Sequence, residues 1–300
     1  MNMQVKHPIF GVGLMLGAMA VLPGIDVIAK MLGQQGLPVL QIVWARLALG
    51  AVLTLPFALK ITGPRGLWPA RPVYHLIRAA FLVAATFCFF LSLHWLPIAD
   101  ALAIFFVQPL IVTLLSALIL REQVGPRRLI AVAVGFIGTM IIIRPGLVEV
   151  NPGSWLALAA GLFLACYFVM TRAISGQAHA MVTTFQTSLL GGLILSVAVW
   201  FVWVPPSPAQ WALFVGLACI ATFGHLMIVR AYDHAEASLL APLAYTEMVT
   251  SVILGWFFFG DFPDFWTFVG VGVLISCALY ISMRERAAGK PPAPEAMEQP

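Results

Sequence analysis

The sequence predicts an all-α integral membrane protein with about ten transmembrane helices, arranged as two inverted five-helix repeats. The first observation is composition: 61% of the 300 residues are hydrophobic and only 9% are charged. The second is a mean hydropathy of +0.98, and the third is a similarity between the two halves of the chain. Soluble domains carry about 45–50% apolar and about 25% charged residues. The natural surroundings of this chain are therefore lipid.

Ten apolar stretches are long enough to cross a bilayer, whose hydrocarbon core of about 30 Å needs roughly 20 helical residues. A backbone in lipid must satisfy its own hydrogen bonds, so these stretches are expected to be helices. The first is too long for the apolar region of a cleaved signal peptide and is expected to remain as a span. The stretches lie near residues 8–29, 38–60, 73–95, 99–120, 127–144, 153–172, 180–203, 209–231, 237–259 and 264–283.

The basic residues are distributed unevenly between the spans, which predicts the orientation of the chain. If the N-terminus is cytoplasmic, thirteen of the 16 lysines and arginines fall on the cytoplasmic side, Lys30 and Arg144 fall outside, and Arg46 lies within a span. Cytoplasmic loops carry such an excess. We therefore expect a multi-pass protein of the cytoplasmic (inner) membrane with both termini cytoplasmic. The thirteen are Lys6, Lys60, Arg65, Arg71, Arg78, Arg121, Arg127, Arg128, Arg172, Arg230, Arg284, Arg286 and Lys290.

Two segments, residues 99–122 and 237–261, resemble each other and predict an internal repeat. Each ends in an acidic residue and is followed by a short loop and a glycine-rich helix that ends in an arginine. Each unit then holds about five helices, and an odd number makes the second unit enter the membrane from the opposite side. The expected units are a first repeat at 8–144, a second repeat at 153–283, and a polar, proline-rich, disordered cytoplasmic tail at 285–300.

The same two segments carry a family resemblance. LHWLPIADALAIFFVQPLIVTLLSALILREQV, residues 93–124, resembles the fourth-helix signature of the EamA family of the drug/metabolite transporter superfamily, and ASLLAPLAYTEMVTSVILGWFFFGDFP, residues 237–263, resembles its counterpart. The resemblance implies ten helices, two inverted EamA repeats and alternating access. Asp261 departs from the glutamate that is common in the second repeat. Members of this family move amino acids, nucleotide-derived metabolites, riboflavin, polyamines and drugs, so the resemblance implies transport without naming the cargo.

Three charged side chains lie well inside spans, where polar groups are costly and mark functional sites. Asp26 and Arg46 lie at similar depth, and they either pair as a packing contact or handle a polar group of a cargo. Asp26 can alternatively bridge to Lys30 one turn on. Glu247 lies near the middle of the ninth span without an obvious basic partner. It is therefore either a packing residue or a proton carrier, and proton coupling is one expectation.

Further polar and aromatic groups lie at similar depth. Gln108 offers a donor and an acceptor, and Pro109 beside it frees a backbone carbonyl, which is tolerated where it lines a cavity. Pro23 and Pro242 are expected to bend their helices. Aromatic residues near Gln108 can stack on a planar cargo such as riboflavin or an aromatic amino acid. The predicted substrate pathway is Asp26, Trp44, Arg46, Phe105, Gln108, Tyr245 and Glu247, with His225 and Gln186 as weaker candidates.

These observations favour a secondary transporter that moves a small polar, planar aromatic metabolite by alternating access. An exporter of amino acids, nucleotide-derived metabolites or drugs is an alternative. A membrane-embedded enzyme is another, but the histidines and cysteines show no HExxH or other metal-binding spacing. A structural or sensory membrane protein would need neither the repeat nor the buried charges. We expect no catalytic residue, metal, cofactor or nucleic acid, and the sequence does not decide between monomer and homodimer.

Overall fold

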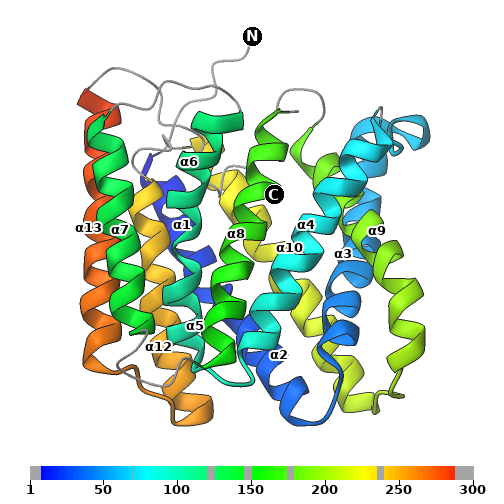
Figure 1. Ribbon diagram of the computed structural model, residues 1–300. Helices are drawn as coiled ribbons and strands as arrows, with labels where there is room; N and C mark the ends of the chain where they lie inside the picture. The colour runs from blue at the N-terminus through cyan, green and yellow to red at the C-terminus, as the bar shows by residue number, and fades with distance from the viewer. Residues whose placement is uncertain are drawn as a thin grey trace.

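The predicted fold class is confirmed by the computed structural model, which describes residues 8–69, 71–119, 126–144, 151–173, 179–234 and 240–287. The regular structure in these ranges is helical, and the helices stand side by side as a bundle (Figure 1). Seven helical stretches of the described chain are long and apolar enough to cross a membrane, and three shorter apolar helices accompany them. The chain is therefore a multi-pass membrane protein of about ten spans.

The first half supplies five spans, of which the first and fourth each consist of two helices. A 3₁₀ turn, η1 (Pro64–Gly66), follows the second span. The helices are α1 (Pro8–Val21), α2 (Pro23–Gln34), α3 (Val39–Thr62), α4 (Pro72–Ser92), α5 (Ile98–Phe105), α6 (Gln108–Ile119) and α7 (Pro126–Ile143).

The second half supplies the other five spans. Its elements are α8 (Pro152–Ala173), α9 (Ala180–Val199), η2 (Trp200–Val202), α10 (Pro208–His234), η3 (Ala241–Tyr245), α12 (Thr246–Phe259) and α13 (Phe265–Ala287). The tail predicted from residue 285 begins inside α13, and its remainder, 288–300, lies outside the described residues.

Proline and glycine set many of the helix limits. Pro72 and Pro208 stand at the first position of α4 and α10, where the missing N–H costs nothing because no helical partner exists there. Gly260 ends α12 with a φ of 71°, a left-handed conformation that glycine adopts without steric penalty. Its N–H bonds to the Trp256 carbonyl at 2.9 Å.

Three spans of the described chain are interrupted partway along their length. The first breaks at Leu22, before Pro23, and the fourth breaks between α5 and α6, before Pro109. In the described part of the ninth span, the 3₁₀ turn η3 precedes the α-helix α12, which begins at Thr246. Proline has no N–H to continue the helical bonding, and so each break leaves irregular backbone at membrane depth. These are the three places where the sequence predicts bent or irregular helices.

Gly161 of α8 packs directly on the break in the fourth span. A Cβ at this position would lie 3.1 Å from the Phe105 carbonyl oxygen and 3.7 Å from the Gln108 nitrogen. The first distance is too short for an ordinary side-chain contact, so glycine allows the α8 backbone to approach the break closely.

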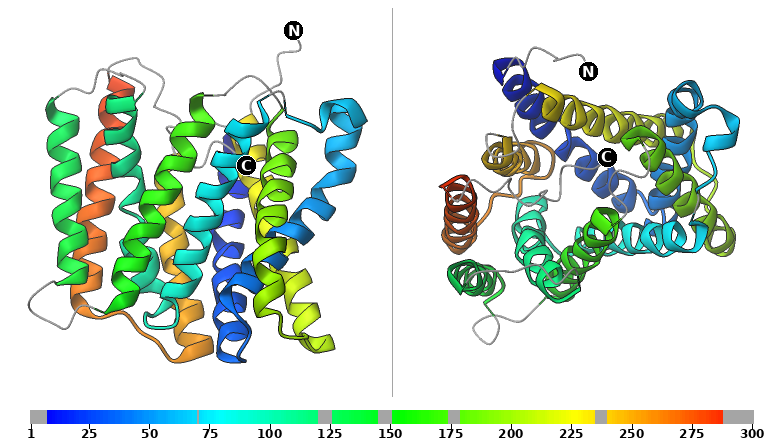
Figure 2. Two further views of the ribbon diagram at one scale, coloured as in Figure 1. Left: turned by 45° about the vertical axis from the view of Figure 1, so that its right-hand side comes forward. Right: turned by 90° about the horizontal axis from the view of Figure 1, so that it is seen from above.

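The helix contacts between the halves follow a two-fold pattern. The second span contacts the seventh (α3 with α9), and the fifth contacts the tenth (α7 with α13). The third contacts the sixth (α4 with α8). A two-fold relation maps this pair onto the eighth and first spans, and these two (α10 with α1) are also in contact. A two-fold relation between two five-helix halves produces this pattern. Seen along the helices, both halves surround the centre of the bundle (Figure 2).

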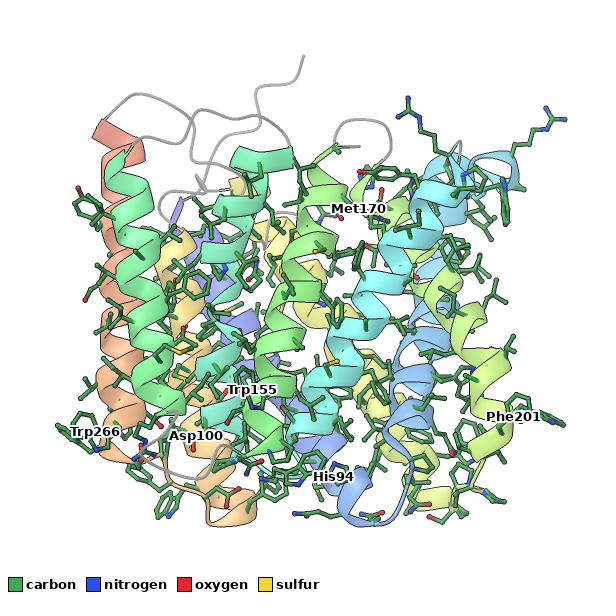
Figure 3. All side chains as sticks on the ribbon, viewed as in Figure 1. His94, Asp100, Trp155, Met170, Phe201 and Trp266 are labelled. Carbon is green, nitrogen blue, oxygen red and sulfur yellow. The ribbon has the colours of Figure 1, made fainter. Side chains whose placement is uncertain are left out.

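The outside of the bundle is apolar, as contact with lipid requires. Phe201 and Trp266 point outward near one end of the helices (Figure 3), and their exposed fractions are 82% and 50%. Aromatic side chains are typical of the membrane–water interfaces. Trp95, Trp155, Trp203 and Trp211, which the sequence predicts in these belts, are also exposed.

Two ion pairs join the halves at the end of the bundle where α2 and α12 finish, within the described residues. Lys30 Nζ lies 2.7 Å from Asp261 Oδ2, and the Arg144 guanidinium pairs with Asp264. Lys30 also donates to the Leu96 carbonyl at 3.3 Å. The alternative prediction, an ion pair between Lys30 and Asp26 of the same helix, is therefore wrong. We call Lys30–Asp261 and Arg144–Asp264 the rim ion pairs.

Candidate functional site

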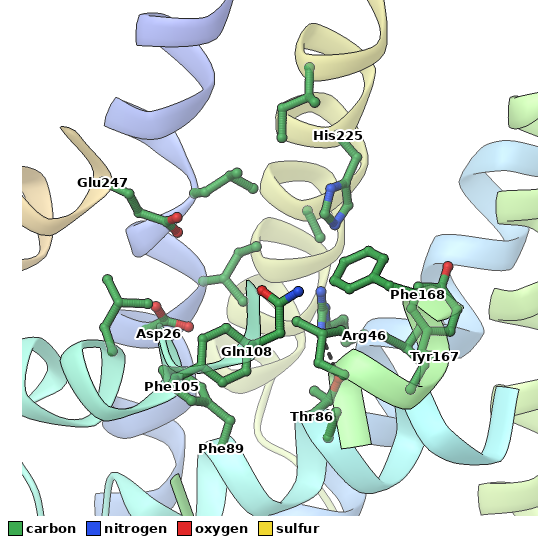
Figure 4. Close-up of a pocket in the computed structure, with 18 of the residues that line it drawn as sticks. Asp26, Arg46, Thr86, Phe89, Phe105, Gln108, Tyr167, Phe168, His225 and Glu247 are labelled. Carbon is green, nitrogen blue, oxygen red and sulfur yellow. Dashed lines mark hydrogen bonds between the residues drawn. The ribbon is translucent and has the colours of Figure 1, made fainter. Parts of the chain in front are cut away.

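A central cavity of about 260 Å³ lies among the helices of both halves (Figure 4). Its lining is largely apolar with a few polar and charged groups, which is typical of small-molecule sites. The cavity brings together six of the seven side chains predicted from the sequence. These are Asp26, Arg46, Phe105, Gln108, Tyr245 and Glu247.

The interrupted spans place three of these side chains. Asp26 lies in the first turn of α2, Gln108 begins α6, and Glu247 lies in the first turn of α12. Helix N-termini carry unpaired N–H groups and a partial positive charge, which favours a carboxylate in the first turn. The α6 N-terminus has no acidic residue there. The breaks therefore point two carboxyl groups and one amide at the same space.

Asp26 and Arg46 face the same cavity without forming an ion pair within 4 Å in the described part of the chain (Figure 4). Arg46 Nη1 instead donates to Thr86 Oγ1 at 3.0 Å. Its guanidinium carbon lies 6.0 Å from the centre of the Phe90 ring, a cation–π distance. The packing alternative, in which the two charges neutralise each other directly, is therefore not formed.

Gln108 is a buried polar group of the cavity with an unsatisfied amide donor. Its side chain is 5% exposed and points between Asp26 and Arg46 (Figure 4). Its Nε2 has no hydrogen-bond partner in the described part of the chain. A buried donor without a partner costs about 1–3 kcal/mol, and a polar ligand in the cavity can remove that cost.

Aromatic rings cover much of the apolar wall. Phe89 and Phe105 lie on one side of Arg46, and Tyr167 and Phe168 lie on another (Figure 4). Rings at such separations offer faces and edges to a flat molecule. The ring pairs with their centre distances are Phe89–Phe105 at 4.9 Å, Phe106–Tyr245 at 5.4 Å and Tyr167–Phe168 at 5.3 Å.

Trp44 lies away from the cavity, unlike the other six predicted residues. Its Nε1 donates to Ser196 Oγ at 2.9 Å, and its ring meets Trp203 edge-on at 5.5 Å. An α-helix turns about 100° per residue, so positions two apart face nearly opposite directions. Since Arg46 faces the cavity, Trp44 on the same helix faces away from it.

His225 lines the cavity, although the sequence ranks it as a weak candidate near a helix end. The reason is the length of α10, which continues to His234 and leaves His225 well inside the bundle. Gln186, ranked equally, does not line the cavity: its Nε2 donates to the Leu67 carbonyl at 3.2 Å.

Arg78 is a buried cation that the sequence assigns to a cytoplasmic segment. Its side chain is fully buried between α4, α8 and α9. It donates to Thr171 Oγ1 and the Thr183 carbonyl, both at 3.3 Å, and to the Thr187 hydroxyl. Its guanidinium carbon lies 5.4 Å from the centre of the Tyr167 ring. Arg78 thus connects three helices and supports Tyr167 and Thr187, which line the cavity.

Comparisons with known proteins agree with this architecture. Residues 9–144 and 151–283 each match the EamA-like transporter family. The chain is 30% identical to a riboflavin transporter of Vibrio cholerae over 94% of this chain and 96% of that protein. It is 26% identical to an S-adenosylmethionine uptake transporter of Rickettsia prowazekii over 87% and 88% of the two chains. It is 28% identical to a pseudopaline exporter of Pseudomonas aeruginosa over 81% and 85%.

A solved crystal structure shares the fold. Its TM-score is 0.61 at 18% identity, and the match covers 91% of this chain and 97% of the other. At this identity the likeness concerns the arrangement of the helices alone.

Proposed function

The chain belongs to the EamA-like transporter family, and on that premise we propose that it is a secondary transporter whose cargo binds in the central cavity. The family and the similar transporters establish movement of a small metabolite across the membrane. The observation that carries the proposal is the cavity itself. Side chains from both halves converge there, including Asp26 near the start of the chain and Glu247 near its end.

The cargo would be exposed to the two sides of the membrane in turn. Residues 8–144 and 153–283 would act as two inverted repeats that rock about the cavity, a mechanism that places substrate at the repeat interface beside interrupted helices. The two-fold contact pattern and the three interrupted spans support this. With both termini in the cytoplasm, as the basic residues predict, the rim ion pairs lie at the outer end of the bundle.

The cargo would be a small polar metabolite with a flat ring system. Two of the similar proteins are named for riboflavin and S-adenosylmethionine, and both compounds contain a flat heteroaromatic ring. The aromatic pairs around Arg46 and Gln108 are suited to such a ring, because stacking adds about 1–3 kcal/mol per ring. Uptake and export run the same cycle in opposite directions, and the similar proteins include both.

Glu247 would carry a proton in this cycle. It lies in the cavity with Asp26, Arg46 and His225, and no lysine or arginine pairs with it in the described chain. A carboxyl group in such a place can hold a proton when the cargo is absent. Flux would then follow an imposed pH gradient.

The test is counterflow in liposomes that contain the purified protein. Labelled riboflavin, tryptophan and S-adenosylmethionine lead a wider panel of vitamins, amino acids and nucleotides. We expect saturable counterflow of at least one compound, absent from protein-free liposomes. No counterflow from folded protein across the panel would reject the proposed function. For the proton, Glu247→Gln should remove the response to a pH gradient; an unresponsive native protein would reject proton coupling alone.

A further inference from the structure

We propose that the cavity is polarised to bind a zwitterionic cargo, with its cationic group at Asp26 and Glu247 and its anionic group at Arg46 and Gln108. This inference rests on the proposed function and names the substrate class of the same cavity. It depends on where the charged groups stand around the space.

The acidic pole consists of Asp26 and Glu247, whose carboxyl groups point into one side of the cavity (Figure 4). Two ionised carboxyl groups that share a space repel. No basic side chain pairs with either of them within 4 Å in the described ranges. A cationic group between them relieves the repulsion and supplies the missing counter-charge.

The basic pole consists of Arg46 and the amide of Gln108. The bond to Thr86 uses one of the five N–H donors of the guanidinium, which leaves others for a carboxylate. The unpartnered Nε2 of Gln108 is buried beside it, at the N-terminus of a half-helix that has no acidic residue in its first turn. Charged and amide donors that converge in this way are suited to a carboxylate.

The two poles together select by rejection as well as by attraction. A cation without a carboxylate leaves Arg46 without a counter-ion when the cavity closes. An anion without an ammonium group leaves Asp26 without a counter-charge and supplies no cation to replace a proton on Glu247. A neutral cargo does both, and buried charges without partners are strongly unfavourable. A zwitterion satisfies both poles at once.

The aromatic rings offer a surface for the flat part of the cargo beside the poles. Phe105 and Phe89 lie beneath Gln108, between Asp26 and Arg46 in Figure 4. An α-amino acid carries its ammonium and carboxylate on one carbon. That carbon would therefore lie between the two poles, with the ring packed on the aromatic wall. Aromatic amino acids and S-adenosylmethionine, which carries an amino-acid end, have this chemistry, whereas riboflavin is uncharged.

The test compares compounds that share a ring and differ in charge. Tryptophan, tryptamine and indole-3-propionate form one series. S-adenosylmethionine and the neutral 5′-methylthioadenosine form a second, and riboflavin is a neutral reference. Each compound is measured for counterflow and for thermal stabilisation of the native protein, since a ligand that binds the folded state raises its stability. We expect the zwitterion of a series to bind at least about ten-fold more tightly than its singly charged or neutral analogues.

Variants assign the poles. Asp26→Asn and Glu247→Gln should reduce the preference for tryptophan over indole-3-propionate about ten-fold, and Arg46→Gln should reduce the preference over tryptamine similarly. Asp100→Asn is the matched control, because Asp100 is a half-buried acid in the first turn of α5 that does not line the cavity. It should leave both preferences unchanged.

The outcomes separate the two proposals. If a transported compound from the wider panel is neutral or singly charged and no zwitterion rivals it, the polarised cavity is wrong while the transporter stands. Zwitterion preference that survives all three cavity variants also overturns the assignment of the poles. If nothing is transported, the proposed function fails first and this inference falls with it.

Discussion

The charged side chains of the rim and those of the cavity differ in what satisfies them. At the rim, Lys30 and Arg144 of the first half each pair with an aspartate of the second half. In the cavity, Asp26, Arg46 and Glu247 face a shared space and form no ion pair with one another in the described chain. The same residue types therefore serve two purposes. Charges paired within the protein hold the halves together, and charges directed at a cavity wait for a ligand.

The largest expected effect comes from removing the cavity cation. Arg46→Ala should lower initial counterflow roughly 30- to 700-fold, since loss of one partner of a buried charge contact costs about 2–4 kcal/mol. The melting temperature should change less than the flux, because Arg46 forms no ion pair within 4 Å in the described chain and its side-chain hydrogen bond is to the neutral Thr86. Fluorescence melting and flux of the same preparation check both parts. Undiminished flux would show that Arg46 does not bind the cargo, and the proposed difference between the cavity charges and the rim ion pairs would then be wrong.

The aromatic wall should give the next largest effect. Phe105→Ala should raise the KM for a ring-containing cargo about ten-fold, because a lost stacking partner costs about 1–3 kcal/mol. The matched control is Phe257→Ala, which removes a ring that is 75% exposed on the outside of the bundle. Equal KM values for the two variants would contradict stacking in the cavity.

Breaking the rim should act on stability rather than on cargo recognition. Lys30→Ala should lower stability by about 1–2 kcal/mol, an intermediate value for a pair whose side chains are 10% and 31% exposed. For a chain of this length the melting temperature should fall by about 2–4 °C. Lys60→Ala, an exposed lysine at the end of α3, serves as the control.

The exchanged pair, Lys30→Asp with Asp261→Lys, should recover most of the lost melting temperature. A change in KM without a change in melting temperature would mean that the rim takes part in binding, and the contrast between the two regions would not hold.

The smallest effect is expected at Trp44. Trp44→Phe keeps an aromatic ring near Trp203 and loses the hydrogen bond to Ser196 with part of the ring surface, so counterflow should stay within about two-fold and stability should fall by about 1 kcal/mol. A ten-fold loss of flux would return Trp44 to the substrate pathway.

The sequence predicts the spans well because lipid leaves few choices. Each apolar stretch of sufficient length becomes a helix, and the prolines at positions 23, 109 and 242 mark the three interrupted spans. Charged residues within membrane spans, such as Arg46 and Glu247, stand out because charges inside lipid are costly. Six predicted residues line the cavity: five polar residues follow from depth and polarity, and Phe105 follows from its place near Gln108.

The facing direction of each helix could not be predicted in the same way. In a soluble helix the polar stripe marks the outside, but here the lipid-facing and buried faces are both apolar, so the sequence pattern does not separate them. This is why Trp44 is assigned to the cavity while Tyr167 and Phe168 receive no such role. The predicted contact of Lys30 and the predicted cytoplasmic position of Arg78 are wrong for a related reason. The partners of both side chains lie in the other half of the chain, far away in the sequence.

Gly161 connects the packing of α8 with the cavity, because it contacts the backbone of two residues that line it. With only hydrogen where a side chain would stand, the α8 backbone lies against the Phe105 carbonyl and the Gln108 nitrogen. A side chain at residue 161 would force the Phe105 carbonyl or Val107 to yield by a few tenths of an ångström, at the break of the fourth span. Gly161 does not line the cavity, yet a substitution there is expected to alter affinity through Gln108. Variation in specificity among such proteins can arise one layer behind the site, in residues as small as this glycine.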